Sequence, residues 1–534
     1  MGSAGSKETD NSPPQKRDWM GLVFSFGSLT TFTSLLLILA LSSCSRGVST
    51  EPGVVNFLIE TMPTNLDPRI GTDAISEHLD GLIFSSLVEL DERRIPRGDL
   101  AEKWETPDPS TYVFHLRSGV KFHDGRALTS TDVKYTFNSI LNRTVLSPKR
   151  GSLELIRSIE TPDAATVIFH LHGPDAGFLW EITRPEIGIV PAGSGADFSS
   201  RLTGTGPFRF VSAQQDNNVL IERNDGYFGG APKISRVQFR VVPEAIVRAL
   251  ELRKGSADVE VNSLTPDMIP VLRQQPTVDI TETPGTNYQY IAFNLDDATL
   301  AKREVRQALA YATNREEIIR YLYRGQAHPA DGPLPKSSWA YEPGIRQYEY
   351  DPQQAERLLD AAGFPRQAAG GMRVKLALKT STEESSRLLA SVLQEQWGKV
   401  GVDLDVRPLE FATLISDMAH GSFEIFTLRW IGANNDPDFF FDYIFDSRMI
   451  PPAGANRGRY RNPEIDELLG QARVEGDRDK RRELFSRVQK IIAEDLPYIS
   501  LWFMDNISVH RKRISDVQLS PTGDFEFLRS VEAR

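Results

Sequence analysis

Strand-like and helical patterns of apolar residues alternate along the chain from Val54 onward. Strand-like runs occupy residues 54–59, 111–116, 166–172, 237–242, 374–378, 402–406 and 423–428. In 166–172 the apolar residues Val167, Phe169 and Leu171 alternate with polar ones, which is typical of a strand with one buried face. The chain shows neither internal repeats nor low-complexity segments, so a globular fold is expected.

Helix signals separate these strands. Thr129, followed three residues later by Asp132, predicts a capped helix over 130–141. A stripe at core spacing is formed by Val305, Ala308, Leu309 and Ala312. Proline-initiated helices are predicted to follow Asp351 and Asn462, and core spacing predicts another helix over 480–492. This mixture of elements predicts α/β lobes with largely parallel sheets.

The N-terminus has the order of a secretory signal. Lys16 and Arg17 precede an apolar stretch that ends at Leu41, and Cys44 follows two serines. The segment 41–44 resembles the lipobox of bacterial lipoproteins, in which the cysteine is acylated, so 1–44 is expected to be a signal segment and 45–53 a tether. Two alternatives stay open: an uncleaved anchor over 21–41, which is long enough to span a bilayer, and an incidental thiol.

Charge and cysteine content narrow the function classes. The formal net charge is −11, and such a surface repels phosphate backbones, so no nucleic-acid partner is expected. Cys44 is the only cysteine, which rules out an intrachain disulfide. Core packing alone must therefore hold the fold.

Motifs of catalysis are absent from the sequence. The segment 204–209 lacks the third glycine of a dinucleotide loop, and in 193–195 the glycines directly flank the serine, unlike a nucleophile elbow. His170 and His172 share a strand face, with His115 and His123 as possible neighbours, but solvated surface histidines explain them better than a metal site. No catalytic residue, metal or cofactor is therefore assigned.

Many short motifs in register carry a family resemblance. They are NLDP at 65–68, LVEL at 87–90, LAEKW at 100–104, YVFHLRSGVKFHDG at 112–125, GTGPF at 204–208, NDGYF at 224–228, YIAFN at 290–294, VRQAL at 305–309 and GPLP at 332–335. From Val54 to the C-terminus the chain resembles the family 5 solute-binding proteins of ABC importers, the group that contains dipeptide- and oligopeptide-binding proteins.

The resemblance implies a class II periplasmic-binding-protein-like clamp of two α/β lobes, with an extra α/β subdomain in the first lobe. Lobe I is expected at 54–84, 201–286 and 503–534, the extra subdomain at 85–200 and lobe II at 287–502. The chain is expected to cross between lobes near 284–288 and 502–506. Gly204-Thr205-Gly206-Pro207 is expected to form a turn at a lobe junction.

The resemblance also implies a function: capture of a small peptide-like solute and its delivery to an ABC permease and ATPase. The expected protein is a monomer, lipid-anchored to the bacterial cell membrane and facing the periplasm or the exterior. Alternatives are a non-peptide cargo (sugar-containing, anionic or a metal chelate), a sensing protein without transport, and a secreted hydrolase, for which no residue set is visible.

The segment around Trp430 departs from the peptide-binding pattern. Peptide-binding members often carry an aspartate there that pairs with the peptide's ammonium group, and this chain has Ala433 in its place. Asn434 and Asp436 follow, and Arg429 precedes the tryptophan. A guanidinium there suits a carboxylate or phosphate, so we hypothesise a ligand without a free ammonium at that end. The alternative is a structural pair of Arg429 with Asp436 or Asp438.

Other residues are expected to line the ligand site through the family geometry. They are Thr61, Met62, Tyr288, Asn294, Lys379 and Thr380. Hydroxyl and aromatic groups suit a wet pocket that contacts mainly ligand backbone. Ordinary loop or core packing is the alternative for each of them.

Overall fold

The computed structural model describes residues 52–534, except 92–93, 184–186, 196, 367–370 and 432–436. The N-terminal signal segment, most of the tether and Cys44 lie outside these residues. Within the described part of the chain, no helix is both long and apolar enough to cross a membrane.

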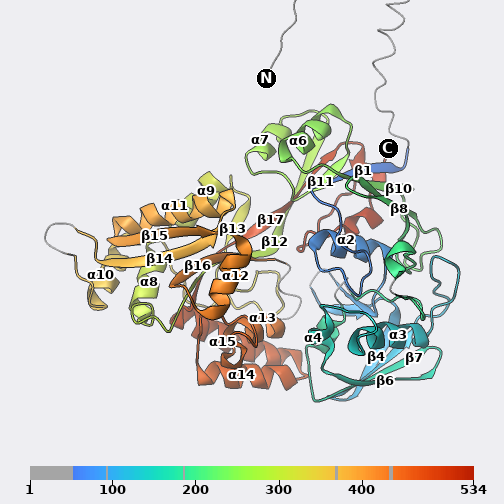
Figure 1. Ribbon diagram of the computed structural model, residues 1–534, viewed down its shortest axis with the longest axis horizontal. Coiled ribbons are helices and arrows are strands. Elements are labelled where there is room, and N and C mark those ends of the chain that lie inside the picture. Colours follow the sequence, from blue (N-terminus) through green and yellow to red (C-terminus); the bar gives the residue numbers. More distant parts are fainter. Residues whose placement is uncertain (1–51, 92–93, 184–186, 196, 367–370, 432–436) are drawn as a thin grey trace, which may run out of the picture. The chain divides into compact units, whose positions relative to one another are not determined.

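One mixed sheet of eleven strands forms the framework (Figure 1). Its strands run in the order β15-β14-β16-β12-β17-β11-β1-β10-β9-β8, with β13 paired to β17 beside this path. Their bounds are β1 Val54–Ile59, β8 Phe208–Gln214, β9 Asn218–Arg223, β10 Arg236–Val241, β11 Val259–Val261, β12 Val278–Phe293, β13 Ala327–Pro329, β14 Val374–Ser381, β15 Val402–Leu409, β16 Ile425–Trp430 and β17 Tyr498–Arg511. The predicted strands are present with shifts of a few residues.

The first lobe is built on the β11-β1-β10-β9-β8 end of this sheet. One face of the sheet buries a cluster that includes Phe57, Phe239 and Leu82. Its helices are α2 (Ala74–Ile83), α6 (Ala245–Lys254) and α7 (Met268–Arg273). C-terminal residues such as Phe525 and Phe527 complete the same cluster, so the chain returns to this lobe at its end.

The second lobe has a helix layer on each face of β15-β14-β16-β12 and the start of β17. One face packs α8 (Arg303–Tyr311), α9 (Arg315–Leu322), α10 (Pro352–Ala361) and α11 (Glu384–Lys399). The other packs α12 (Phe411–His420), α13 (Pro437–Phe445), α14 (Pro463–Val474) and α15 (Arg478–Asp495). The two lobes thus have separate hydrophobic clusters, as a two-lobed clamp requires.

Two long strands, β12 and β17, belong to both lobes and pair with each other. Their antiparallel register runs from Val278↔Arg511 to Ala292↔Tyr498 and breaks between Pro284 and Tyr288. Both crossings between the lobes therefore lie side by side in one two-stranded ribbon.

The prediction of largely parallel sheets is wrong. Only the β1–β10, β1–β11, β14–β15 and β14–β16 pairs of the large sheet are parallel. The remaining pairs described in that sheet are antiparallel. The reason is the return of the chain through β12 and β17, which inserts antiparallel strands between the two parallel groups.

The extra subdomain is a separate four-stranded antiparallel sheet in the order β4-β5-β7-β6. Its strands are β4 Ala101–Asp108, β5 Thr111–Leu116, β6 Ile156–Asp163 and β7 Thr166–Leu171, with helices α3 Ser130–Leu141, α4 Arg150–Leu153 and α5 Phe178–Glu181. Phe114, Phe137 and Phe169 meet in its core. The predicted capping box of Thr129 and Asp132 opens α3.

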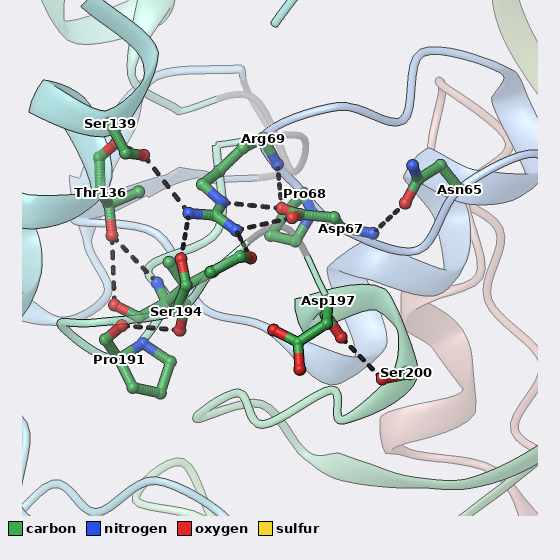
Figure 2. A network of polar contacts seen from close by, with 12 residues as sticks. Asn65, Asp67, Pro68, Arg69, Thr136, Ser139, Pro191, Ser194, Asp197 and Ser200 are labelled. Atoms are coloured by element: carbon green, nitrogen blue, oxygen red, sulfur yellow. Dashed lines mark hydrogen bonds and ion pairs between the residues drawn. The ribbon is translucent and has the colours of Figure 1, made fainter. Parts of the chain in front are cut away.

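A buried ion pair joins this subdomain to the first lobe (Figure 2). The Arg69 guanidinium contacts Asp67 through Nε (2.9 Å) and Nη2 (2.7 Å), and both side chains are nearly inaccessible. Arg69 also donates to Ser139 Oγ of α3 and to the carbonyls of Ser194 and Gly195. All five guanidinium N–H groups thus have acceptors, and one side chain fixes three chain segments.

A second junction is made by His123 and the glycine turn at 204–206. His123 Nδ1 accepts from the Gly204 N–H at 3.2 Å, and Nε2 donates to the Gly206 carbonyl at 3.1 Å. A Cβ on Gly204 would lie 2.0 Å from the Ile83 carbonyl oxygen. The turn therefore packs backbone against backbone where subdomain and lobe meet, and it offers no phosphate cradle.

Candidate ligand-binding site

A row of polar side chains crosses the second-lobe sheet beside the β12–β17 ribbon. Gln289 of β12 lies opposite Arg429 of β16 on one side and opposite Trp502 of β17 on the other. Directly opposed residues of antiparallel strands share a face of the sheet. Because Trp502 belongs to the cluster under α8–α11, all three side chains stand on that face.

Thr380 of the neighbouring strand β14 lies on the same face, two residues below this row, since Leu378 opposite Ile425 makes Thr380 level with Thr427. Leu376 and Leu378 of β14 belong to the same cluster, and the two-residue period of a strand places Thr380 on their face. The parallel strands β14 and β16 both end beside this row, at Ser381 and Trp430. The carboxyl ends of parallel strands are a common place for ligands in α/β sheets.

Several donors on this face of the sheet have no acceptor among the described residues. Trp502 and Thr380 are fully buried, yet Trp502 Nε1 and Thr380 Oγ1 form no hydrogen bond, and neither does Arg429 Nε. Gln289, in contrast, donates to Thr427 Oγ1 and to the Leu428 carbonyl, both at 2.9 Å. The amide is fixed, and the groups beside it are available.

Tyr323 covers the row from the end of α9. Its ring lies 5.0 Å from that of Trp502. Burial raises the pKa of Tyr323 to about 12, and the nearby charge of Arg429 opposes that rise. The tyrosine is therefore a neutral hydroxyl at physiological pH, beside a cation.

The alternative role of Arg429, a structural ion pair with Asp436 or Asp438, can be followed only for Asp438. Asp438 pairs with Arg481 at 3.3 Å and not with Arg429. Asp436, Ala433 and Asn434 lie outside the described residues. Within the described chain, Arg429 forms no ion pair.

Three of the predicted site residues use their polar groups inside the protein. Tyr288 is fully buried and bonds Ser500 Oγ at 2.6 Å. Asn294 donates to the carbonyls of Gly421 (3.2 Å) and Phe423 (2.8 Å). Lys379 contacts Asp417 at 2.6 Å and also the Ser422 carbonyl. These contacts tie neighbouring elements together, and they explain the three residues without a ligand.

The remaining predicted residues are accessible. Trp430 is half-buried on the opposite face and packs edge-on against Phe440 at 5.7 Å. Thr61 is exposed and Met62 is half-buried against the first-lobe cluster, in the loop after β1. Arg429 and Thr380 thus lie on the same face of neighbouring strands, while Thr61 and Met62 belong to the other lobe.

A small cavity lies elsewhere in the second lobe. It measures about 30 Å³ and lies between Arg315, Asp331, Tyr348 and Ser500. That space holds a water or two, whereas small-molecule pockets measure about 300–1,000 Å³. Arg315 there is already bonded to the carbonyls of Ala330 and Ser500.

The histidines of the subdomain do not form a metal-ligand set. In the β5–β7 ladder His170 pairs with Thr111 and His115 with Thr166, at opposite ends. Each contacts a carboxylate, Glu160 and Glu105 respectively, at 3.3 Å. Over the described residues, no group of three or more histidine, cysteine, aspartate or glutamate side chains is arranged for a metal ion.

Two lobes joined by a paired-strand ribbon, with unsatisfied polar groups beside the joint, define a two-lobed solute-binding protein. Residues 96–450 match the model of the bacterial extracellular solute-binding proteins, family 5. The chain belongs to this family, whose members are receptors for solutes.

The chain also aligns with individual relatives over most of their length. The chain is 28% identical to a dipeptide-binding protein of Escherichia coli, over 94% of this chain and 98% of that one. It is 30% identical to heme-binding protein A of Haemophilus influenzae, over 79% of this chain and 82% of that one. The structure of HbpA2 from Haemophilus parasuis superposes with a TM-score of 0.80 at 26% identity, over 90% of this chain and all of that one.

Proposed function

We propose that this chain is the extracytoplasmic receptor of an ABC importer and that it captures a peptide or peptide-like solute between its lobes. The observation that carries the proposal is the set of unpartnered donors beside the β12–β17 ribbon, and we propose that a solute held between the lobes contacts the second lobe there. Relatives named for dipeptides and di/tripeptides support the solute class. Delivery to a permease and its ATPase follows from the family.

Capture of this kind is a shift between open and closed populations. A solute that contacts both lobes favours the closed form only by its differential affinity for that form. No covalent step is needed, so we propose that the protein is not an enzyme. Incubating peptides with purified protein leaves them intact under this proposal, and their hydrolysis would contradict it.

The N-terminus completes the proposal. We infer that Cys44 is acylated and that the mature chain is a monomer, held at the cell membrane and facing the periplasm or the exterior. Mass spectrometry of the mature N-terminal peptide tests this directly. A cysteine-linked diacylglycerol is the expected result, and an unmodified, uncleaved Met1 terminus would contradict it.

Calorimetric titration with free and N-acetylated di- and tripeptides tests the solute class. If the position of Ala433 leaves an ammonium group without a partner, acetylation costs little affinity. Tight binding of free peptides that is lost on acetylation would disprove that preference, yet it would still support peptide capture. Failure of every peptide to bind would contradict the proposed function.

A haem-like tetrapyrrole is the second candidate solute. The relative named heme-binding protein A, 30% identical over 79% of this chain, favours it. Mass spectrometry of the solute that the protein retains on purification from its native host distinguishes a peptide from a tetrapyrrole. A shift of the main haemin absorption band on titration with the protein gives the same decision more quickly.

A further inference from the structure

We propose that the outer face of α6 is a docking surface for the lipid bilayer that holds the acyl anchor. This inference rests on the proposed acylation of Cys44, and it adds which side of the first lobe faces the membrane. The surface, called the α6 face below, has three exposed apolar side chains toward the start of the helix and two exposed cations in its last turn: Ile246, Val247, Leu250, Arg253 and Lys254.

The α6 face is one continuous stripe along the helix. At 3.6 residues per turn its five side chains fall within an arc of about 120°, and the buried Arg248 and Leu252 point the opposite way. Surface helices usually carry polar residues on the side away from the core. Here Ile246 is 61% exposed and Leu250 47%, so apolar surface is left open to solvent.

The neighbouring helix α7 adds to this apolar surface. The two helices lie next to each other (Figure 1). Leu252 of α6 and Ile269 of α7 belong to one cluster with Leu58 of β1 and Val509 of β17, so both helices cover the same face of the sheet. Val271 of α7 is 54% exposed. Exposed apolar side chains that gather on one side of a lobe indicate a binding partner.

The charges at this face complement an anionic bilayer. Arg253 and Lys254 are exposed, and neither forms an ion pair among the residues that the structure describes. The nearby Glu251 is paired with Arg240 at 3.3 Å, and Glu244 lies before the first turn, at the other end of the helix. The net charge of the chain is −11, so most of its surface repels anionic lipid. A locally basic, apolar face approaches such a bilayer with the least repulsion.

The tether enters the first lobe beside the basic end of α6. The carbonyl of Val54, the first residue of β1, accepts from Arg513 at 2.6 Å, and Arg513 pairs with Asp258 at 2.7 Å. Asp258 lies in the short connection between α6 and β11. The segment 45–53 separates Cys44 from β1, and it spans roughly 35 Å at full extension. An acylated Cys44 therefore keeps the α6 face within reach of the bilayer.

The test uses the acylated chain on vesicles, with a fluorophore on the α6 face. Because Cys44 is the only cysteine and acylation blocks it, Leu250→Cys supplies a single thiol for an environment-sensitive probe. The labelled protein is anchored to the outside of vesicles of phosphatidylcholine and phosphatidylglycerol that also contain doxyl-labelled lipid. We expect the emission to shift to the blue and to be quenched by the doxyl group.

Leu146→Cys is the matched control. Leu146 is also an exposed leucine, at 84%, but it belongs to the extra subdomain, between α3 and α4. A probe there should keep its emission and escape quenching. Sedimentation with the vesicles reports on the acyl anchor separately and should be the same for both labelled proteins.

Two double variants on the Leu250→Cys background distinguish docking from mere closeness to the bilayer. Ile246→Asn with Val247→Asn removes apolar contact, and Arg253→Gln with Lys254→Gln removes the positive charge. We expect each pair to lower the ratio of docked to undocked protein about tenfold or more. All four positions are exposed, so folding should be preserved, and thermal unfolding checks this.

Each outcome decides. Sedimentation without quenching at Leu250→Cys, or equal quenching at both labelled positions, overturns the docking surface and leaves the acyl anchor standing. Quenching that both double variants retain also overturns it, because the short tether alone then explains the closeness. A blue shift that depends on protein concentration and not on doxyl lipid overturns it in favour of a second copy of the chain. Failure to sediment overturns the proposed anchor and the docking surface with it, while calorimetry with peptides tests solute capture independently.

Discussion

Trp180 and Trp339 face each other with ring centroids 6.1 Å apart, although one belongs to the extra subdomain and the other to the second lobe. The Arg481 guanidinium lies 5.5 Å from the first ring and 5.6 Å from the second. Beside them the Ala176 N–H donates to the Arg473 carbonyl at 2.8 Å. This contact joins the extra subdomain to the second lobe.

Replacing Trp180 by alanine should therefore favour the open form. The indole packs against Trp339 and Arg481 only when the lobes meet, so the variant loses this burial and cation–π contact in the closed form alone. We expect a larger radius of gyration for the solute-free variant in small-angle X-ray scattering, and solute affinity reduced by about tenfold, the equivalent of 1.4 kcal/mol. Trp104→Ala is the control, since Trp104 packs against Phe114 within the subdomain; an identical effect there would argue against the contact.

Arg69→Met should be among the most destabilising single changes in the first lobe. It leaves the buried Asp67 carboxylate without its partner, which costs about 3–5 kcal/mol. Urea denaturation measures the loss. The double variant Asp67→Asn, Arg69→Met should recover part of the stability, because the unpaired charge is gone. Equal stability of the single variant and the wild type would show that the network of Figure 2 contributes little.

His123 should make stability fall in mild acid. Burial lowers the pKa of His123 to about 4, below the value of about 6.5 for an unfolded histidine. The neutral side chain is thus favoured in the folded state. The contribution of this neutral imidazole to the unfolding free energy is complete above pH 6.5. It is lost as the pH falls toward 4, and the total loss is about 3 kcal/mol.

Comparing variants isolates this histidine from other titrating groups. The difference in unfolding free energy between wild type and His123→Gln should shrink from pH 7 to pH 4. A constant difference over this range would contradict the assignment.

Two glycine-to-alanine changes should have opposite signs. Gly204→Ala puts a Cβ 2.0 Å from the Ile83 carbonyl oxygen, so backbone must move and a loss of about 3 kcal/mol or more is expected. Gly470 lies in α14 with nothing within 4 Å of its would-be Cβ, and alanine there should add about 0.5–1 kcal/mol. Thermal unfolding of the two variants checks both signs.

Local patterns were sufficient for most single elements. The strands at 54–59 and 111–116 and the helix at 130–141 have the predicted bounds, because alternation and a capping box are local signals. The long strands β12 and β17 were not predicted as strands. Pro284 and Gly285 suggest a break in β12, and the structure accommodates them at the register irregularity opposite Met504 and Asp505.

The candidate site was likewise predictable only in part. Arg429 was proposed from its position before Trp430 and Thr380 from family geometry, whereas the neighbouring Trp502, Gln289 and Tyr323 were not proposed. Their relation depends on which residues oppose each other across β16, β12 and β17, and a single sequence does not specify that register. The separation of Arg429 from Asp438 likewise depends on Arg481, about 50 residues further along the chain.

The paired crossing of β12 and β17 also bears on how long a cargo stays. Because β12 and β17 are hydrogen-bonded to each other, they bend together as one strip. The two lobes therefore rotate about a single axis and do not slide apart independently. The ladder of this strip is interrupted between Pro284 and Tyr288, and a strip bends most easily where its hydrogen bonds are interrupted. Release of the cargo then requires a bend at this step as well as the loss of the cargo's contacts with both lobes.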